Sequence, residues 1–335
     1  MQNLTDNIIE LNREMEPYII QGSASRPVPF KNKYGDKFKP LQFVHFSDIH
    51  AVLDLWNRMV EYVNHYKEYI DFALHTGDYC GNNQSLYVDF YNYGTQCDRP
   101  IYNCVGNHDT VITPKWIGNT KESTHELLFA PINDDSRNVN FLECEYSMTY
   151  YKDFPEANVR LVVLDLYYDI ELQSEWLKQI LADAKEKNLG VITAMHEPSG
   201  EIHDTYGVTF HTKNDYQSLV GKRRQVPFEP IIADFVAQGG CHICNLAGHE
   251  HHDFFGRTDA GILNSIVPSA TNWNGWCDGK RIRGTRTYDC FNVVSIDANL
   301  GILKIARIGN NTDNYFRSQR ALCYDYINKK VIYNG

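Results

Sequence analysis

One pattern constrains the fold of this chain more than any other: an apolar, strand-like run stops, and side chains able to bind a metal ion follow at once. The loops at the carboxyl ends of neighbouring strands converge in open α/β sheets, and ligands gather there. The repetition therefore predicts one sheet edge that is rich in carboxylates, imidazoles and an amide. The pattern recurs after five runs, at Asp48 and His50, at Asp78, at Asn107, His108 and Asp109, at His196, and at His249 and His251.

Segments with the periodicity of amphipathic helices lie between some of these strand-like runs. Apolar residues at helical spacing predict helices over 53–70, 171–188 and about 228–238. Strands that alternate with helices in this way are typical of an α/β domain with helices covering a sheet. The predicted strands cover 41–47, 71–77, 100–106, 159–166, 190–196 and 241–249.

The domain organisation follows from changes in composition along the chain. The composition predicts an N-terminal extension over residues 1–40 and a single domain over residues 41–335. Within that domain, turn signals indicate an irregular insertion at about 197–226. The part from about 276 is rich in predicted strands, and 291–309 predicts a hairpin that completes or adds a second sheet.

Composition excludes several classes of protein. Apolar residues make up 43% and charged residues 22% of the chain, as in ordinary soluble globular proteins. No stretch approaches the roughly 18 uninterrupted apolar residues of a membrane helix. Nine cysteines without a paired framework favour free thiols in a reducing compartment, so we expect a cytoplasmic protein. A net charge of −10 argues against binding of polyanions by bulk attraction.

The stretch "NLAGHEHHDFF" (245–255) contains three histidines and a glutamate in four consecutive positions. Side chains alternate between faces along an extended backbone, so His249 and His251 would point one way and Glu250 and His252 the other. Two imidazoles on one face can contribute to a metal site but cannot complete one. The remaining ligands must therefore come from elsewhere in the chain.

Together these motifs resemble those of the calcineurin-like metallophosphoesterases. The blocks Asp48-Ile49-His50, Gly77-Asp78, Gly106-Asn107-His108-Asp109, His196 and Gly248-His249-Glu250-His251 stand in the family's order and spacing, and the resemblance covers roughly residues 41–275. It implies a two-sheet αβ sandwich with flanking helices, which agrees with the element order above.

The resemblance also implies two metal ions and a reaction. The first metal would be held by Asp48, His50, Asp78 and His251, and the second by Asp78, Asn107, His196 and His249. Imidazole, carboxylate and amide ligands suit Mn, Fe or Zn. A metal-bridging hydroxide would then attack a phosphate mono- or diester, with His108 as the general acid. Asp109 would either hold the imidazolium form of His108 or orient its own loop.

Subfamily features narrow the expected substrate to a small phosphate ester. After Asp78 the sequence runs Tyr79-Cys80-Gly81-Asn82, without the Asp-Arg-Gly that the family's protein serine/threonine phosphatases carry there. Purple acid phosphatases have glycine where His50 stands, and a tyrosine three places after the second-motif aspartate, where this chain has Gly81. Phosphomonoesterase and phosphodiesterase activities both remain open.

Two other functions compete with this one. A metal-dependent nuclease would use the same ligand blocks, although the acidic composition and the lack of an extended basic stripe disfavour nucleic acid as a partner. A non-catalytic scaffold on the same fold would be expected to have lost ligands, and this chain keeps all seven.

Other residues of functional type have a simpler interpretation. Cys241 and Cys244 lack the second pair that a structural zinc site needs. Packing or solvent exposure is the ordinary role for Trp273 and Trp276, for Lys222–Arg224, and for Arg281, Arg283 and Arg286, although a substrate wall or a phosphate contact is the alternative. The same holds for the remaining histidines, His45, His65, His75, His125, His203, His211, His242 and His252.

Overall fold

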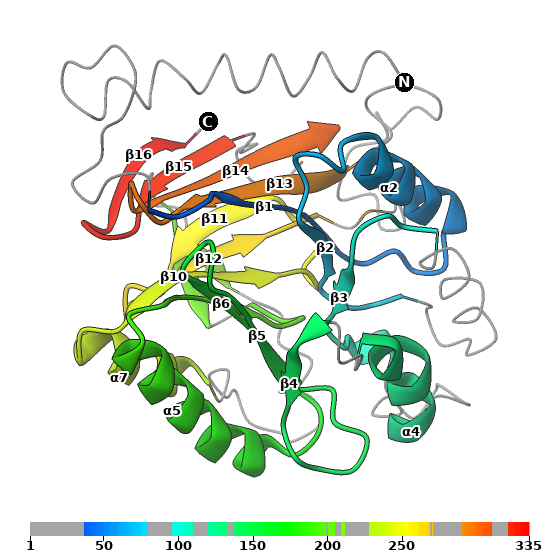
Figure 1. Cartoon of the computed structure of the whole chain (residues 1–335), viewed down its shortest axis with the longest axis horizontal. Coiled ribbons are helices and arrows are strands. Elements are labelled where there is room, and N and C mark those ends of the chain that lie inside the picture. Colours follow the sequence, from blue (N-terminus) through cyan, green and yellow to red (C-terminus); the bar gives the residue numbers. More distant parts are fainter. Residues whose placement is uncertain are drawn as a thin grey trace.

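Two β-sheets pack in layers to form the core of the protein, with helices on the outside (Figure 1). Within the described residues the first sheet has the strand order β16-β15-β14-β13-β1-β2-β3, and the second β4-β5-β6-β7-β10-β12-β11-β8-β9. The two-sheet αβ sandwich predicted from the sequence is therefore confirmed. The computed structural model describes residues 37–79, 96–109, 120–132, 137–198, 200–204, 209–211, 228–268, 270, 290–309 and 321–334.

The first sheet has a parallel part and an antiparallel part. Strands β1, β2 and β3 run parallel, and β13 pairs antiparallel to β1 on the other side. The C-terminal strands β13 to β16 then continue as an antiparallel meander, so the tail completes this sheet. Its strands are β1 (Leu41–Phe46), β2 (Phe72–His75), β3 (Ile101–Asn103), β13 (Cys290–Asp297), β14 (Ile302–Gly309), β15 (Ala321–Asp325) and β16 (Lys330–Asn334).

The second sheet has a parallel centre made of β6, β7, β10 and β12. Antiparallel strands extend it on both sides. The short strands β8 and β9 lie within the segment 197–226, which the sequence predicted to be irregular and most of which lies outside the described residues. The strands are β4 (Val139–Phe141), β5 (Tyr150–Phe154), β6 (Val159–Val163), β7 (Gly190–Ala194), β8 (Glu201–His203), β9 (Thr209–His211), β10 (Cys241–Ala247), β11 (Phe254–Arg257) and β12 (Leu263–Ile266).

Stacked aromatic rings join the facing surfaces of the two sheets. Phe43 of β1 stacks on Phe72 of β2 with ring centroids 4.4 Å apart, and Phe72 stacks on Phe154 of β5 in the other sheet at 5.0 Å. Burying a phenylalanine side chain contributes roughly 1.5–3 kcal/mol to folding. These rings belong to one continuous apolar core that spans both sheets.

The helices cover the outer faces of the sandwich (Figure 1). Helix α2 (Leu53–His65) buries an apolar stripe that includes Trp56 and Met59. It ends five residues before the predicted end at 70, because the chain turns after Tyr66 to bury Ile70 ahead of β2. The remaining helical segments of the described residues are α4 (Lys121–Thr124), α5 (Ile170–Glu186), α7 (Glu229–Ala237), a π-helical turn His125–Phe129, and 3₁₀ turns Asn107–Asp109 and Ala130–Ile132. None of the helices in the described part of the chain is long and apolar enough to span a bilayer.

A buried ion pair links the first sheet to the loop that follows β10. Arg307 of β14 is 1% exposed, and its Nη2 donates to Asp253 Oδ1 over 2.7 Å, while its Nε donates to Asn292 on β13. Asp253 is itself 2% exposed and lies two residues after His251. The pair therefore holds the end of a histidine-rich loop against the opposite sheet.

We expect Arg307→Leu to lower the free energy of unfolding by about 3–5 kcal/mol, because the substitution leaves the Asp253 carboxylate buried without its cation. The double variant Arg307→Leu/Asp253→Leu should recover part of this loss. Lys178→Gln, which removes a solvent-exposed pair with Glu175, is the control and should change the stability little. Urea unfolding measures all three. Equal stability of Arg307→Leu and the control would contradict the assignment.

Candidate metal centre

The seven predicted ligands and His108 form one cluster where the two sheets meet. They lie in the loops at the carboxyl ends of five strands, β1, β2 and β3 of the first sheet and β7 and β10 of the second. Most of these side chains are buried, and the exposed fraction of Asp48 and of His196 is 0%. The sheet edge predicted from the sequence is therefore a junction between two sheets.

One half of the cluster is built from Asp48, His50 and His251. The Nε2 atom of His251 lies 3.1 Å from Asp48 Oδ1 and 3.1 Å from His50 Nε2. The third side of this triangle, from His50 Nε2 to Asp48 Oδ1, measures 3.7 Å. Three donor atoms at this spacing can share one metal ion.

The other half of the cluster is built from Asn107, His196 and His249. Asn107 Oδ1 lies 3.0 Å from His196 Nε2 and 3.1 Å from His249 Nδ1. The two ring nitrogens are 3.3 Å apart. This group also presents its donor atoms toward a common point.

Asp78 lies between the two halves. Its Oδ2 atom is 3.3 Å from His196 Nε2 in one half and 3.8 Å from His50 Nε2 in the other. The position of this carboxylate therefore allows it to contact two cations at once.

The loop after β10 differs from its predicted geometry. The strand ends at Ala247 instead of continuing through His249, and His249 and His251 adopt left-handed backbone angles, with φ of 65° and 58°. The two rings consequently do not share a strand face. His249 faces Asn107 and His196, whereas His251 faces Asp48 and His50.

Left-handed backbone conformations are shared by Asp48, His50 and Asp78, whose φ angles are 55°, 45° and 61°. Such angles are rare for residues other than glycine, and each costs on the order of 1–3 kcal/mol unless its surroundings enforce it. Backbone hydrogen bonds enforce them here, because Asp48 N–H donates to Gly77 O and His50 N–H donates to Asp78 O. The two loops therefore hold each other in place.

Asp109 orients the loop that carries Asp78. Its carboxylate accepts the backbone N–H groups of Asp78 (2.8 Å), Gly106 (2.9 Å) and Tyr79 (2.9 Å). Of the two roles that the sequence left open, the geometry favours loop orientation, because the carboxylate near the His108 ring is Asp78, at 3.8 Å. Burial and the charge of Asp78 raise the pKa of Asp109 to about 7, against the effect of these hydrogen bonds.

The ring of His196 is oriented as a metal ligand needs. Its Nδ1 donates to the backbone carbonyl of Thr76 over 2.6 Å, which leaves Nε2 facing the cluster. A side chain at Gly77 would prevent this arrangement, since a Cβ there would lie 2.6 Å from His196 Nδ1. A second partner of this kind commonly fixes the ring of a ligating histidine.

In the cluster, burial and the charges of neighbouring side chains shift each pKa in opposite directions. Burial would raise the pKa of Asp48 and of Asp78, but the nearby histidines, foremost His251 and His196, hold both pKa values below the usual range. Burial would likewise lower the pKa of His196, yet the charge of Asp78 raises that pKa to about 10. Burial lowers the pKa of His50 to about 4 in spite of both aspartates.

The donor set fits metal ions. Two ionised carboxylates in a buried site need nearby positive charge, and imidazole, carboxylate and amide donors together suit transition metals and Mn. Three Asp/His triads have donor atoms within 4.8 Å of one another, and they overlap through shared residues. The arrangement fits a dinuclear centre better than a single ion, because the triads extend to both sides of Asp78.

A buried pair beside the cluster was missed from the sequence. Glu197 directly follows His196, is 0% exposed, and accepts a hydrogen bond from the hydroxyl of Tyr167 over 3.0 Å. Because Glu197 is the chain neighbour of His196 and Tyr167 is hydrogen-bonded to it, the pair lies beside the cluster. Glu197 carried the same signal as the ligands, a carboxylate at the end of a strand, whereas nothing local in the sequence marked Tyr167.

Other sequence candidates are not among the described residues of the cluster. Trp273, Trp276, Lys222–Arg224 and the arginines at 281, 283 and 286 lie outside the described residues. Cys241 and Cys244 are free thiols and belong to none of the possible metal-binding groups in the described part of the chain.

The two-sheet sandwich with an Asp/His cluster at the carboxyl ends of its strands defines the class of metallophosphoesterases. Residues 41–253 match the family profile of the calcineurin-like phosphoesterases. The chain belongs to this family.

Solved structures are similar to this chain at low sequence identity. A dimetal phosphatase from Danio rerio is 12% identical, with a TM-score of 0.52, over 82% of this chain and 97% of that chain. GAP50, the anchor in the inner membrane complex of Plasmodium, is 12% identical, with a TM-score of 0.48, over 84% of this chain and 88% of that chain. None of the curated proteins has a significantly similar sequence.

We expect Gly248→Ala to abolish metal binding, because a Cβ at this position would lie 1.9 Å from Ser47 Oγ and 2.5 Å from Asp48 Oδ2. The loops after β1 and β10 would have to separate, and their ligands with them. Gly261→Ala is the control: a Cβ there meets nothing within 4 Å, so only backbone strain at φ 79° is added. Calorimetric titration with Mn²⁺ should show binding to the control and none to Gly248→Ala. Undiminished affinity in Gly248→Ala would show that the two loops need not be in contact.

Proposed function

We propose that this protein hydrolyses a small phosphate mono- or diester with two metal ions. Asp48, His50, Asp78 and His251 would hold the first ion, and Asp78, Asn107, His196 and His249 the second. The observation that carries the proposal is the position of Asp78 Oδ2 between His196 at 3.3 Å and His50 at 3.8 Å, with a complete group of donors on either side. Family membership and the dimetal phosphatase of the same fold support it.

Two metal ions bound there would activate a water molecule for attack on phosphorus and neutralise the charge of the phosphate. Mn, Fe and Zn are the candidates, because imidazole nitrogens and carboxylate oxygens contribute together. The protein itself supplies the bridging carboxylate of Asp78 and the oriented rings. The hydrogen bond from His196 to the Thr76 carbonyl keeps one ring from rotating away from its position.

His108 is proposed as the general acid that protonates the leaving group. Its backbone N–H donates to Asp78 Oδ1 over 2.8 Å, which fixes the start of the side chain beside the cluster. Its Nε2 lies 3.8 Å from Asp78 Oδ2, and 30% of the side chain is exposed, more than for His50 or His196. A ring at the mouth of the cluster can reach a bound phosphate ester and exchange its proton with solvent.

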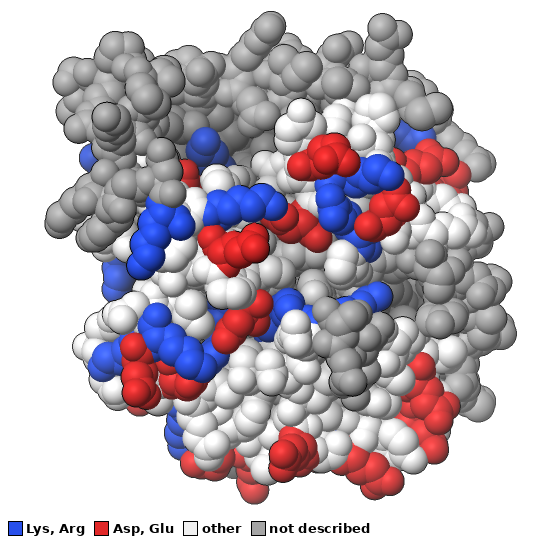
Figure 2. Space-filling view, viewed as in Figure 1, with Lys and Arg blue, Asp and Glu red and all other residues white. Residues whose placement is uncertain are grey.

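A small substrate is favoured over nucleic acid. In the view of Figure 2, the lysine and arginine side chains of the described residues are interleaved with aspartate and glutamate and form no continuous basic surface. The chain as a whole carries a net charge of −10. Proteins that bind nucleic acid without sequence specificity depend on clustered positive charge.

The cysteines among the described residues form no disulfide, which supports a proposed cytoplasmic location.

The first test combines metal content with substrate class. The wild-type protein should hold two transition-metal ions per chain and hydrolyse phosphomono- or diesters in a screen with Mn, Zn, Fe and Mg supplied separately. Asp78→Asn should lose metal and more than about 100-fold in turnover, because a neutral amide bridges two cations poorly. Asp234→Asn on the exposed face of α7 is the matched control. Full metal occupancy and turnover in Asp78→Asn would refute the bridging role. Salt-sensitive cleavage of single-stranded DNA would favour a nuclease instead.

The second test isolates His108. His108→Ala should retain both metals but lose about 10²-fold in rate on an alkyl phosphate ester, the lower end of what general acid catalysis contributes. A nitrophenyl ester should be affected much less, because its leaving group hardly needs a proton. Metal analysis and kcat on the two substrates provide the comparison. Equal losses on both esters would instead assign His108 to phosphate binding, and loss of metal would make it a ligand.

A further inference from the structure

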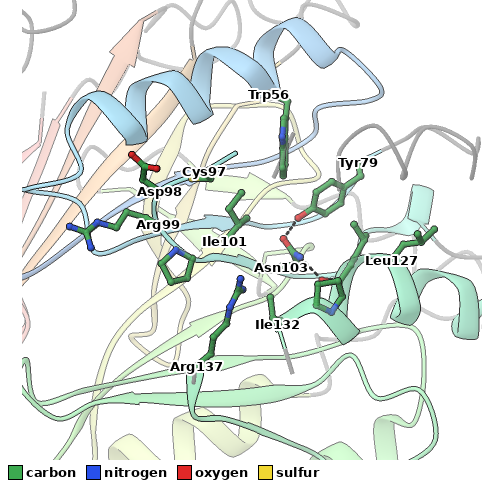
Figure 3. Close-up of a pocket in the computed structure, with 13 residues that line it drawn as sticks. Trp56, Tyr79, Cys97, Asp98, Arg99, Ile101, Asn103, Leu127, Ile132 and Arg137 are labelled. Atoms are coloured by element: carbon green, nitrogen blue, oxygen red, sulfur yellow. Dashed lines mark hydrogen bonds between the residues drawn. The ribbon is translucent and has the colours of Figure 1, made fainter. Parts of the chain in front are cut away.

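Helix α2 covers one end of the outer face of the first sheet. Its Trp56 points from the helix toward the loop after β2, where the ring centroid lies 5.6 Å from that of Tyr79 (Figure 3). Trp56 also contacts Phe46 of β1 at 5.5 Å, and Tyr62 of α2 contacts Phe291 of β13 at 4.8 Å. The cover that α2 provides therefore reaches from β1 to the beginning of β13.

A second apolar surface lies on the same outer face, over the C-terminal strands. In β15, Leu322 and Tyr324 belong to the core between the sheets, so Ala321 and Cys323 point to the opposite face. These two residues and Ile302 of β14 form a separate apolar group, here called the outer cluster. Partly buried side chains that pack against it are those of Leu300, Ala306 and Ile332.

The outer cluster is buried, although no helix of the described residues covers it. The exposed fraction is 1% for Cys323, 3% for Ala321 and 8% for Ile302. Figure 1 shows α2 at the other end of this sheet, and α5 and α7 on the side of the second sheet. Apolar sheet faces are buried by packing against another layer of the fold. A layer outside the described elements therefore covers this face.

The described chain begins beside the outer cluster. Phe38 N–H donates to Asn299 Oδ1 over 2.8 Å, and Asn299 Nδ2 donates to the Phe38 carbonyl over 2.6 Å. Asn299 lies in the turn between β13 and β14, and the next residue, Leu300, packs against the outer cluster. The segment that precedes Lys37 is therefore attached at the edge of this face.

The first sixteen residues of that segment have the sequence pattern of an amphipathic helix. Leu4, Ile8, Leu11 and Met15 recur at spacings of three or four positions, which places them on one side of a helix. Pro17 then favours a helix end before it. A helix of this length measures about 24 Å. The eight-residue strands β13 and β14 measure about 27 Å, so the two lengths match.

We propose that residues 1–16 form a helix that packs on the outer cluster through this apolar stripe. Residues 17–36 would connect it to Phe38, and twenty residues can span up to roughly 66 Å. The helix would do for β14 and β15 what α2 does for β1. The occupant is this segment because it is attached at the edge of the face and supplies a matching apolar surface. The proposal involves no metal ligand and is independent of the proposed reaction.

Cys323 can report whether the face is covered. Labelling of the full-length protein with N-ethylmaleimide, followed by peptide mass spectrometry, measures the reaction rate at each cysteine. Burial raises the pKa of Cys323 to about 11, and the thiolate is the reactive form, so a covered Cys323 should react slowly. Cys244, buried in the second sheet, should stay protected in every variant, and the partly exposed Cys144 should react in all of them.

Two neighbouring isoleucines provide a matched pair of variants. Ile8→Asp places a carboxylate within the stripe, whereas Ile9→Asp makes the same change outside it. Ile8→Asp should raise the labelling rate of Cys323 by about tenfold or more, because burial of one isoleucine stabilises the covered state by about this factor. Hydrogen exchange over residues 1–16 should also become faster. Ile9→Asp should behave as the wild type, and circular dichroism and thermal unfolding check that both variants are folded.

Two results would overturn the proposal outright: rapid labelling of Cys323 in the wild-type protein, or equal labelling in Ile8→Asp and Ile9→Asp. Protection of Cys323 that weakens on dilution, together with a dimer in light scattering, would overturn it in favour of a second copy of the chain on this face. Selective exposure of Cys323 in Ile8→Asp, with a monomeric wild-type protein, would support it.

Discussion

The carboxylate of Asp109 accepts hydrogen bonds from the backbone N–H groups of Asp78, Gly106 and Tyr79, and the geometry of the site depends on this contact. It joins the loop after β3 to the loop after β2 and holds Asp78 in a left-handed conformation. The loop after β2 in turn supplies the carbonyls that accept the N–H groups of Asp48 and His50. One buried side chain that is not itself a proposed ligand therefore determines where several proposed ligands can lie.

The cluster also depends on how the two sheets are packed. His196 and His249 come from the second sheet, but their partners Thr76 and Asp48 belong to the first: Thr76 O accepts from His196 Nδ1, and Asp48 Oδ2 accepts from His249 N–H. The Arg307–Asp253 pair and the stacked Phe43, Phe72 and Phe154 rings join the same two layers. Because the site is a junction, any change that shifts one sheet against the other also changes the spacing of the donor atoms.

The sequence by itself determined the fold class and pointed to the residues proposed as metal ligands. Apolar periodicity predicted the strands that carry the site, the β13–β14 hairpin and the helices α2, α5 and α7, with boundary errors such as the end of α2. It did not predict the strands β4, β5, β8, β9, β11 and β12 of the second sheet. The polar residue at each strand end marked all seven proposed ligands. What only the tertiary structure decided is how these residues are arranged: the left-handed turns at His249 and His251, the role of Asp109, and the Tyr167–Glu197 pair. Periodicity reports the local environment of each residue, whereas these features come from contacts between segments that are 30 or more positions apart in the chain.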